Sequence, residues 1–249
     1  MKAGARLNKR LWLFLGLFLC AVVPFSAHGA DKLVLNTGTR DPFTTEDKNG
    51  FLDLLIKEVF QRIGIEAEII VYQASARALS NADEGVDDGA TLRVKGIEKK
   101  FPNLIRVPEK LMDNDFVAYS LHDYLDVSNW ASMASYDIAY ILGWQIFQNN
   151  LPDHKSTVRT KDAKQLMALL AHDRVDLVLY ERWQGLWRAN KLDMKIKVYE
   201  PPLAQREMFM YLNKKHADLV EKVATSLAEI KKDGTYQKIF DQTLTPYLQ

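Results

Sequence analysis

The chain has 249 residues, with 33 Lys or Arg against 32 Asp or Glu, so its formal net charge is +1. This length can bury a substantial core, in one large domain or two small ones. A near-neutral surface of mixed sign argues against nucleic acid as a partner, because nucleic-acid-binding domains carry clustered positive charge.

The first thirty residues are expected to form a cleaved export signal. Four cations precede an apolar run over 11–25, and small residues follow over 26–30. A membrane anchor is the alternative, but a span needs roughly 20 apolar residues and this run is shorter and contains Pro24. Cleavage is expected after Ala27, Gly29 or Ala30, which predicts a periplasmic protein.

The mature chain has different chemistry from the full one. Loss of the four signal cations leaves 29 Lys or Arg against 32 Asp or Glu, a net charge of −3. The single cysteine, Cys20, lies in the signal, so we expect no disulfide or thiolate chemistry after cleavage.

Short β-branched runs alternate with helical patterns from residue 31 onward, which predicts an α/β fold. In the first half, strands are predicted over 33–36, 68–72, 86–91 and 104–107. Apolar residues between 51 and 63 fall on one face of a helix that Gly64 ends, and a short helix is expected over 76–82. These segments complete a set of β–α units by about residue 110.

The second half repeats this scheme with different residues. Strands are predicted over 137–142, 175–180, 195–199 and 208–212, and helices over 163–171, 217–231 and 236–244. The segment 175–180 is almost entirely apolar, as in a parallel strand that is buried on both faces. The chain has no Gly/Ser-rich linker, so a second lobe has to be inserted into the first and joined to it by strands.

Three motifs carry a family resemblance. The first motif consists of Asp-Pro-Phe-Thr at 41–44 followed by Asn-Gly-Phe-Leu-Asp-Leu-Leu at 49–55. The second is Asp-Arg-Val-Asp-Leu-Val-Leu-Tyr-Glu at 173–181, and the third is Leu-Ala-Glu-Ile-Lys-Lys-Asp-Gly-Thr-Tyr at 227–236. In this order they resemble the family 3 extracellular solute-binding proteins, the receptors of polar amino-acid importers of the ABC type. Further segments, 74–79, 85–89, 96–99 and 101–109, are similar to a branch of that family whose ligands are poorly assigned.

The resemblance implies a two-lobed periplasmic-binding-protein-like fold of type II. Lobe 1 is expected to comprise 31–118 and 204–249, and lobe 2 to comprise 119–203, with hinge strands near 116–121 and 206–212. Such a receptor closes around a small-molecule ligand and delivers it to the membrane permease of an ABC transporter. We therefore expect a monomeric periplasmic receptor that is not an enzyme and has no cofactor.

Two charged residues at strand ends are candidates for ligand contacts. Glu181 follows an apolar strand, and the resemblance implies that the acid at this position binds the ligand's amino group. The alternative is that Glu181 caps the helix that follows. Arg93 also follows a predicted strand and has the fork geometry that suits a carboxylate. The family's usual carboxylate-binding arginine is absent, because 96–99 read Gly-Ile-Glu-Lys. Arg93 either replaces it or is a surface residue.

Five further residues are candidates for the walls of the cleft, namely Arg77, Arg40, Phe43, Gly143 and Trp144. Arg77 opens a short helix, and Arg40 stands where amino-acid receptors commonly have an aromatic residue. Phe43 would form an apolar wall, while the turn at Gly143 would offer backbone N–H groups to an anion and Trp144 would stack on the ligand. Solvated arginines and aromatic core packing are the alternatives. Arginines at turns predict a ligand with at least one carboxylate or comparable anion.

Other chemistry has little support in the sequence. Histidines at 122, 154, 172 and 216 lack metal-ligand spacing, so no metal site is expected, and nucleotide-binding and serine-hydrolase motifs are absent. Two alternatives to transport remain. A few relatives are lyases, such as periplasmic cyclohexadienyl dehydratase, and there Glu181 or Glu98 would be the general acid while Arg93 or Arg77 held the substrate. A sensory receptor that signals to a membrane kinase fits the same residues.

Overall fold

The computed structural model describes residues 32–151 and 156–248. Its strands there are β1 (Leu33–Thr37), β2 (Ala67–Val71), β3 (Gly89–Val94), β4 (Leu104–Arg106), β5 (Met112–Ser120), β6 (Asp137–Ile141), β7 (Ser156–Thr160), β8 (Leu177–Glu181), β9 (Lys197–Val198) and β10 (Ala204–Asn213). Its α-helices are α1 (Phe51–Arg62), α2 (Ser75–Asp83), α3 (Gln145–Gln148), α4 (Ala163–Ala171), α5 (Arg182–Lys191), α6 (Val220–Lys232) and α7 (Thr235–Thr243). The predicted export signal and His154 lie outside the described residues.

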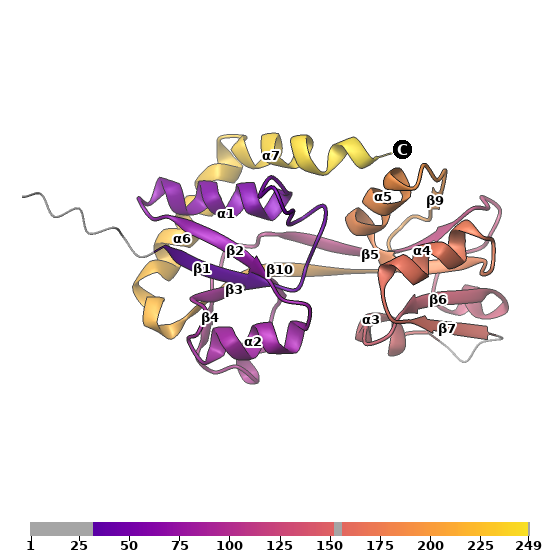
Figure 1. Cartoon of the computed structure of the whole chain (residues 1–249), viewed down its shortest axis with the longest axis horizontal. Helices are drawn as coiled ribbons and strands as arrows, with labels where there is room; N and C mark the ends of the chain where they lie inside the picture. The colour runs from indigo at the N-terminus through magenta and orange to yellow at the C-terminus, as the bar shows by residue number, and fades with distance from the viewer. Residues whose placement is uncertain (1–31, 152–155, 249) are drawn as a thin grey trace, which may run out of the picture. The chain divides into compact units, whose positions relative to one another are not determined.

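The strands form one mixed sheet in the order β2-β1-β3-β10-β5-β8-β6-β7, with β4 paired to β10 and β9 paired to β5. Figure 1 shows the elements in two groups. Lobe 1 holds β1 to β4 with α1, α2, α6 and α7, and lobe 2 holds β6 to β9 with α3, α4 and α5. Within each lobe the central strands run parallel, as β–α units require, and the mixed α/β fold is the one predicted.

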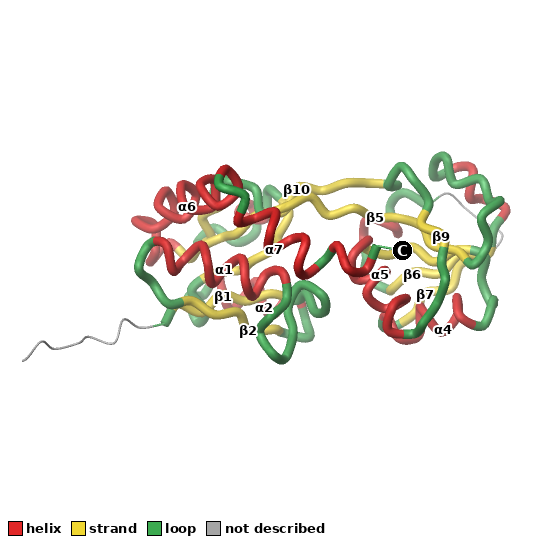
Figure 2. The backbone as a smooth tube through the Cα atoms, turned by 90° about the horizontal axis from the view of Figure 1, so that it is seen from above, coloured by secondary structure: helices red, strands yellow, loops and turns green. Residues whose placement is uncertain are grey.

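The strands β5 and β10 connect the lobes as an antiparallel pair (Figure 2). Their register runs from Met208 opposite Met112 to Ala204 opposite Phe116, after which β5 continues beside β8. The other end of β10 continues beside β3 and β4. The β10 residues of the crossing, 205–207, are exposed, whereas 208–213 are all buried in lobe 1. A two-stranded ribbon therefore carries the chain between two cores.

The core of lobe 1 follows the predicted helical periodicity. In α1 the apolar residues that recur on one face are buried, namely Phe51, Leu52, Leu55, Ile56, Val59 and Phe60. Gly64 takes the left-handed conformation, with φ 73°, just beyond the helix end. Late segments of the chain cover this helix, because the Phe51 ring makes edge contacts with Tyr236 and Phe240 of α7, at centroid distances of 5.6 and 5.8 Å.

Two strands, β3 and β7, differ most from the expectation. The predicted strand over 86–91 begins only at Gly89, because Asp87 and Asp88 accept hydrogen bonds from Asn36 Nδ2 and Val34 N, both at 2.7 Å. These bonds hold 86–88 in a turn. The strand β7 was not predicted at all, since Ser-Thr-Val-Arg-Thr has a mostly polar composition and the strand lies at the edge of the sheet. No helix in the described ranges is long and apolar enough to cross a membrane.

Candidate functional site

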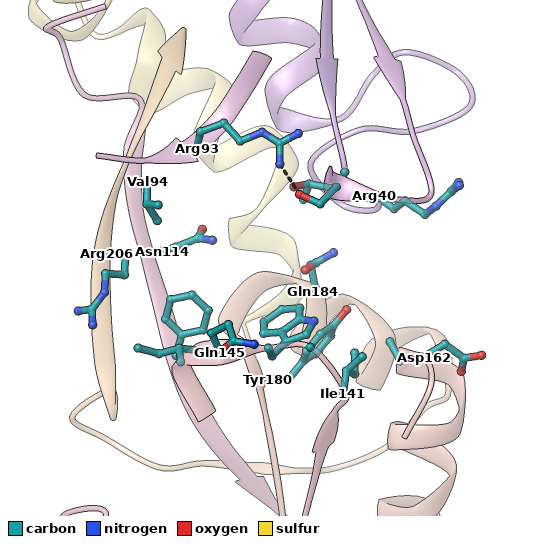
Figure 3. A pocket seen from close by; sticks show the side chains of 18 of the residues that line it. Arg40, Arg93, Val94, Asn114, Ile141, Gln145, Asp162, Tyr180, Gln184 and Arg206 are labelled. Atoms are coloured by element: carbon teal, nitrogen blue, oxygen red, sulfur yellow. Dashed lines mark hydrogen bonds between the residues drawn. The ribbon is translucent and has the colours of Figure 1, made fainter. Parts of the chain in front are cut away.

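A cleft of about 830 Å³ lies between the lobes (Figure 3). Its lobe 1 wall comes from the segments after β1, before α2 and at the end of β3. Its lobe 2 wall comes from the ends of β6 and β8 and from α3 and α5. Ligands of open α/β sheets bind at such carboxyl strand ends. The volume suits a small molecule.

Arg93 is the buried cation of the lobe 1 wall. Its side chain is 8% exposed, and its Nη1 donates a hydrogen bond to Ser75 Oγ at 2.6 Å. Its Nε and Nη2 are buried and have no hydrogen-bond partner among the described residues. Burial lowers the pKa of Arg93 to about 10, so the guanidinium still carries its charge at neutral pH. A buried cation with two free donors is unfavourable until an anion binds to it.

A β-bulge precedes Arg93. Phe209 of β10 pairs with Arg93 and Tyr211 pairs with Ala90, so two residues of β3 stand opposite one residue of β10. Leu92 within the bulge has φ 56°, a conformation that is uncommon for a residue other than glycine. Bulges are over-represented beside functional sites, where they redirect a side chain. Here the bulge sets the direction in which Arg93 leaves the strand.

Lobe 2 contributes an aromatic wall. The half-buried Trp144 contacts Phe116 at 6.0 Å and Tyr180 at 5.0 Å between ring centroids, and it stacks on the buried Phe147 at 5.8 Å with an interplanar angle of 3°. Gly143 has φ 90° at the turn that precedes this tryptophan. Trp144 therefore both packs on its own lobe and faces the cleft. An apolar or planar part of a ligand would fit against it.

Helix α5 brings a second arginine to the cleft. Arg188 is half-buried, its Nε is buried without a partner among the described residues, and its Cζ lies 5.5 Å from the Trp187 ring centroid. Gln184 stands one helical turn earlier and also lines the cleft. Burial raises the pKa of Tyr180 to about 12, while the nearby positive charge of Arg188 acts in the opposite direction. Lobe 2 thus offers amide and guanidinium donors beside the aromatic wall.

The packing of α5 against β5 fixes these donors in place. The Tyr119 hydroxyl donates to the carbonyl oxygens of Glu181 and Arg182, at 3.2 and 2.5 Å. The Tyr119 ring lies against Gly185, where a Cβ atom would overlap it. Only glycine allows this approach, so Gly185 sets the position of the helix that carries Arg188.

The charges around the cleft are strongly unequal. Its charged lining residues are Arg40, Arg93, Arg188, Arg206 and Asp162. Arg40 and Arg206 are exposed, and Figure 3 shows both directed away from the centre. Asp162 caps α4, where it accepts a hydrogen bond from Gln165 N at 2.8 Å. Among the described residues none of the four arginines forms an ion pair, so the cleft has an excess of positive charge.

The structure brings four of the seven candidate residues to the cleft, namely Arg93, Arg40, Gly143 and Trp144. Glu181 is 1% exposed, and its two carboxyl oxygens accept hydrogen bonds from Trp183 N at 3.1 Å and Gln184 N at 2.8 Å, so it caps α5, as the alternative interpretation predicted. Burial raises the pKa of Glu181 to about 8. Phe43 is fully buried against Phe51, and Arg77 is exposed on α2 outside the cleft. These three residues do not line the cleft.

Sequence reasoning missed several cleft residues, of which Arg188 and Gln184 had a usable signal. They follow the buried strand β8 and are four residues apart, so they share one face of the helix that begins there. Asn114 gave no signal, because it lies in a polar stretch of β5, yet its Oδ1 is buried and unpartnered at the cleft. The described residues contain no group of three or more His, Cys, Asp or Glu that could hold a metal ion.

Comparisons with known proteins agree with the two-lobed architecture. No family model matches the sequence. An uncharacterized protein of Shewanella oneidensis is 22% identical over 259 residues, covering 92% of this chain and 92% of the relative. Similar solved structures include the GluR0 ligand-binding core of Nostoc punctiforme in complex with L-glutamate. Its TM-score is 0.66 and its sequence identity 15%, and the match covers 85% of this chain and 98% of that chain.

Two further solved structures have the same likeness. An arginine-binding protein from T. maritima, as a mutant, has a TM-score of 0.65 and 17% identity, covering 86% of this chain and 95% of that one. An ancestral amino-acid-binding protein, a precursor of cyclohexadienyl dehydratase, has a TM-score of 0.67 and 18% identity with the same two coverages. At these identities the likeness shows the fold, and the predicted two-lobed periplasmic-binding-protein-like fold is confirmed.

Proposed function

We propose that the protein is a solute-binding receptor of the family 3 type, which captures a small anionic metabolite between its lobes. The observation that carries this proposal is Arg93, a buried guanidinium with two free N–H donors in the cleft between the lobes. Such a group binds a carboxylate or comparable anion strongly once water is excluded, because charge-assisted hydrogen bonds strengthen in a low-dielectric site.

The wider biological role follows from the fold and the predicted signal. Proteins with this fold include a ligand-binding core in complex with L-glutamate and an ancestral amino-acid-binding protein. We propose a monomer in the periplasm that delivers its ligand to an ABC permease, with lobe 2 formed by 119–203. A sensory role at a membrane kinase would use the same cleft, and genes linked to this one would distinguish it from transport.

Binding explains the cleft better than lyase chemistry does. Glu181 accepts two backbone N–H bonds outside the cleft, and Glu98 accepts a hydrogen bond from the Tyr211 hydroxyl at 3.0 Å without lining it. A general acid has to reach the reacting atoms. Asp162, the acid at the margin of the cleft, holds the start of α4. We therefore propose a receptor rather than an enzyme.

The test is a thermal-shift screen of the purified mature protein against metabolites of defined charge. We expect carboxylates to raise the melting temperature, since a ligand at 100 times its Kd stabilises the folded state by about 2.7 kcal/mol. The same ligands should leave an Arg93→Met variant unshifted, while Arg174→Met, which removes an exposed arginine outside the cleft, should respond like the wild type. Stabilisation by neutral sugars alone would contradict the proposal.

A further inference from the structure

We infer that the ligand is a compact dianion, with two anionic groups on a short apolar or planar body and no ammonium group. This ligand class rests on the proposed receptor function and makes it more specific. Three features of the described part of the cleft carry it: an incompletely paired guanidinium in each lobe, buried in lobe 1 and half-buried in lobe 2, the absence of an acid free to pair with an ammonium group, and an aromatic wall on one side.

The first anionic group is bound by lobe 1. Arg93 uses Nη1 for its bond to Ser75 Oγ, and this leaves Nε and Nη2 as adjacent donors. Two neighbouring N–H groups of one guanidinium match the two oxygens of a carboxylate. Among the described residues no carboxylate occupies this position, so the ligand supplies it.

The second anionic group is bound by lobe 2. Arg188 of α5 lines the cleft, and its Nε is buried without a partner among the described residues. Its guanidinium lies over the Trp187 ring, with Cζ 5.5 Å from the ring centroid, and its charge interacts with the Tyr180 hydroxyl. Because Arg93 and Arg188 belong to different lobes, a ligand with two anionic groups bridges them, and a ligand with one satisfies a single lobe.

Among the described lining residues, no acid is free to pair with an ammonium group. Asp162 is the one acid among the described lining residues, and it is engaged at the start of α4, whereas four arginines surround the same space. Glu181, the family position for an amino group, is turned to backbone N–H groups. Asp115 of β5 is paired with Arg182 at 3.0 Å and with Gln205 at 2.8 Å. A zwitterion would bring a cation to an already cationic site.

The body of the ligand fits between the two anion positions. Trp144, Phe116 and Tyr180 offer a planar apolar surface there, and Figure 3 places Tyr180 on the wall opposite Arg93. The buried, unpartnered Asn114 Oδ1 accepts one hydrogen bond, which suits a hydroxyl on that body. A planar or unsaturated dicarboxylate with one hydroxyl would pair with Arg93, Arg188 and Asn114.

Calorimetric titration with matched probes tests the inference. Aliphatic α,ω-dicarboxylates of four to eight carbons and an aromatic dicarboxylate are compared with the monocarboxylate and the 2-amino dicarboxylate of each length. We expect the best dicarboxylate to bind at least tenfold more tightly than either matched probe. Tighter binding of the 2-amino compound, or equal binding of the monocarboxylate, would overturn the dianion.

Variants separate the two anion positions. Arg188→Met should weaken dicarboxylate binding at least tenfold and leave monocarboxylate binding unchanged, while Arg93→Met should weaken both. Arg174→Met serves as the matched control. If Arg188→Met retains wild-type affinity for every dicarboxylate, or if only a non-dianionic ligand binds in an Arg93-dependent manner, the inference fails and the receptor function stands. If no anion binds and neutral sugars do, both fail.

Discussion

Replacement of Arg93 by Met should remove ligand binding without weakening the empty protein. The side chain is almost fully buried, and burial lowers its pKa to about 10, which corresponds to about 3 kcal/mol of unfavourable desolvation at 1.36 kcal/mol per unit. Against this stands one charge-assisted hydrogen bond to Ser75, worth about 1.5–3 kcal/mol. Met keeps the apolar stem of the side chain, and Ser75 remains exposed to water. The substitution therefore leaves no enclosed cavity and no buried polar group without a hydrogen-bond partner.

The balance predicts a ligand-free variant that is as stable as the wild type or up to about 1–2 kcal/mol more stable. Its free energy of unfolding would be measured by urea denaturation without ligand, with an unchanged m-value as the sign that both end states are intact. Affinity for the anionic ligand should fall at least about thirty-fold, because loss of a buried charge partner costs about 2–5 kcal/mol. A ligand-free protein destabilised by more than about 1 kcal/mol, or wild-type affinity, would refute this reasoning.

Two further substitutions test the support of the cleft. Glu181→Gln should flatten the pH dependence of stability. In the wild type, Glu181 keeps its proton in the folded state up to about pH 8 but loses it in the unfolded state near pH 4.5, so wild-type stability should fall across this window by at most about 1.4 kcal/mol per pH unit. The control Glu229→Gln, on the exposed face of α6, should behave like the wild type. Gly185→Ala should cost about 1–3 kcal/mol because its Cβ overlaps the Tyr119 ring, and Tyr119→Leu should restore part of that loss.

Urea denaturation measures both effects. Parallel slopes for wild type and Glu181→Gln between pH 5 and pH 8 would show that the buried carboxyl does not hold a proton in that range. Equal stability of Gly185→Ala and wild type would show that α5 can move away from β5 without loss of free energy, and then the position of Arg188 would not depend on this glycine.

The sequence predicts elements well where local patterns decide them. Helix α4 has the predicted bounds, because its apolar face and the Asp162 side chain, which caps it, both lie within a few residues. The strand β7 and the first half of β5 escape prediction, since their positions depend on long-range pairing rather than on apolar composition.

The candidate site was harder to predict because it depends on side-chain direction at strand ends. The predicted strand 175–180 continues through Glu181, and successive side chains of a strand point to opposite faces. Tyr180 therefore faces the cleft, and Glu181 turns back to cap α5. Arg93 reaches the cleft through a bulge at Leu92, which the local sequence does not reveal.

The crossing of the chain between the lobes also determines the order in which they can be completed during synthesis. Figure 1 shows lobe 1 assembled from both early and late segments, whereas lobe 2 comes from the middle of the chain. The Phe51 face of α1 receives its cover from Tyr236 and Phe240 only when α7 has been made. Chains grow from the amino end, so the lobe that is started first is finished last, and a nascent chain exposes an aromatic surface until its final helix emerges.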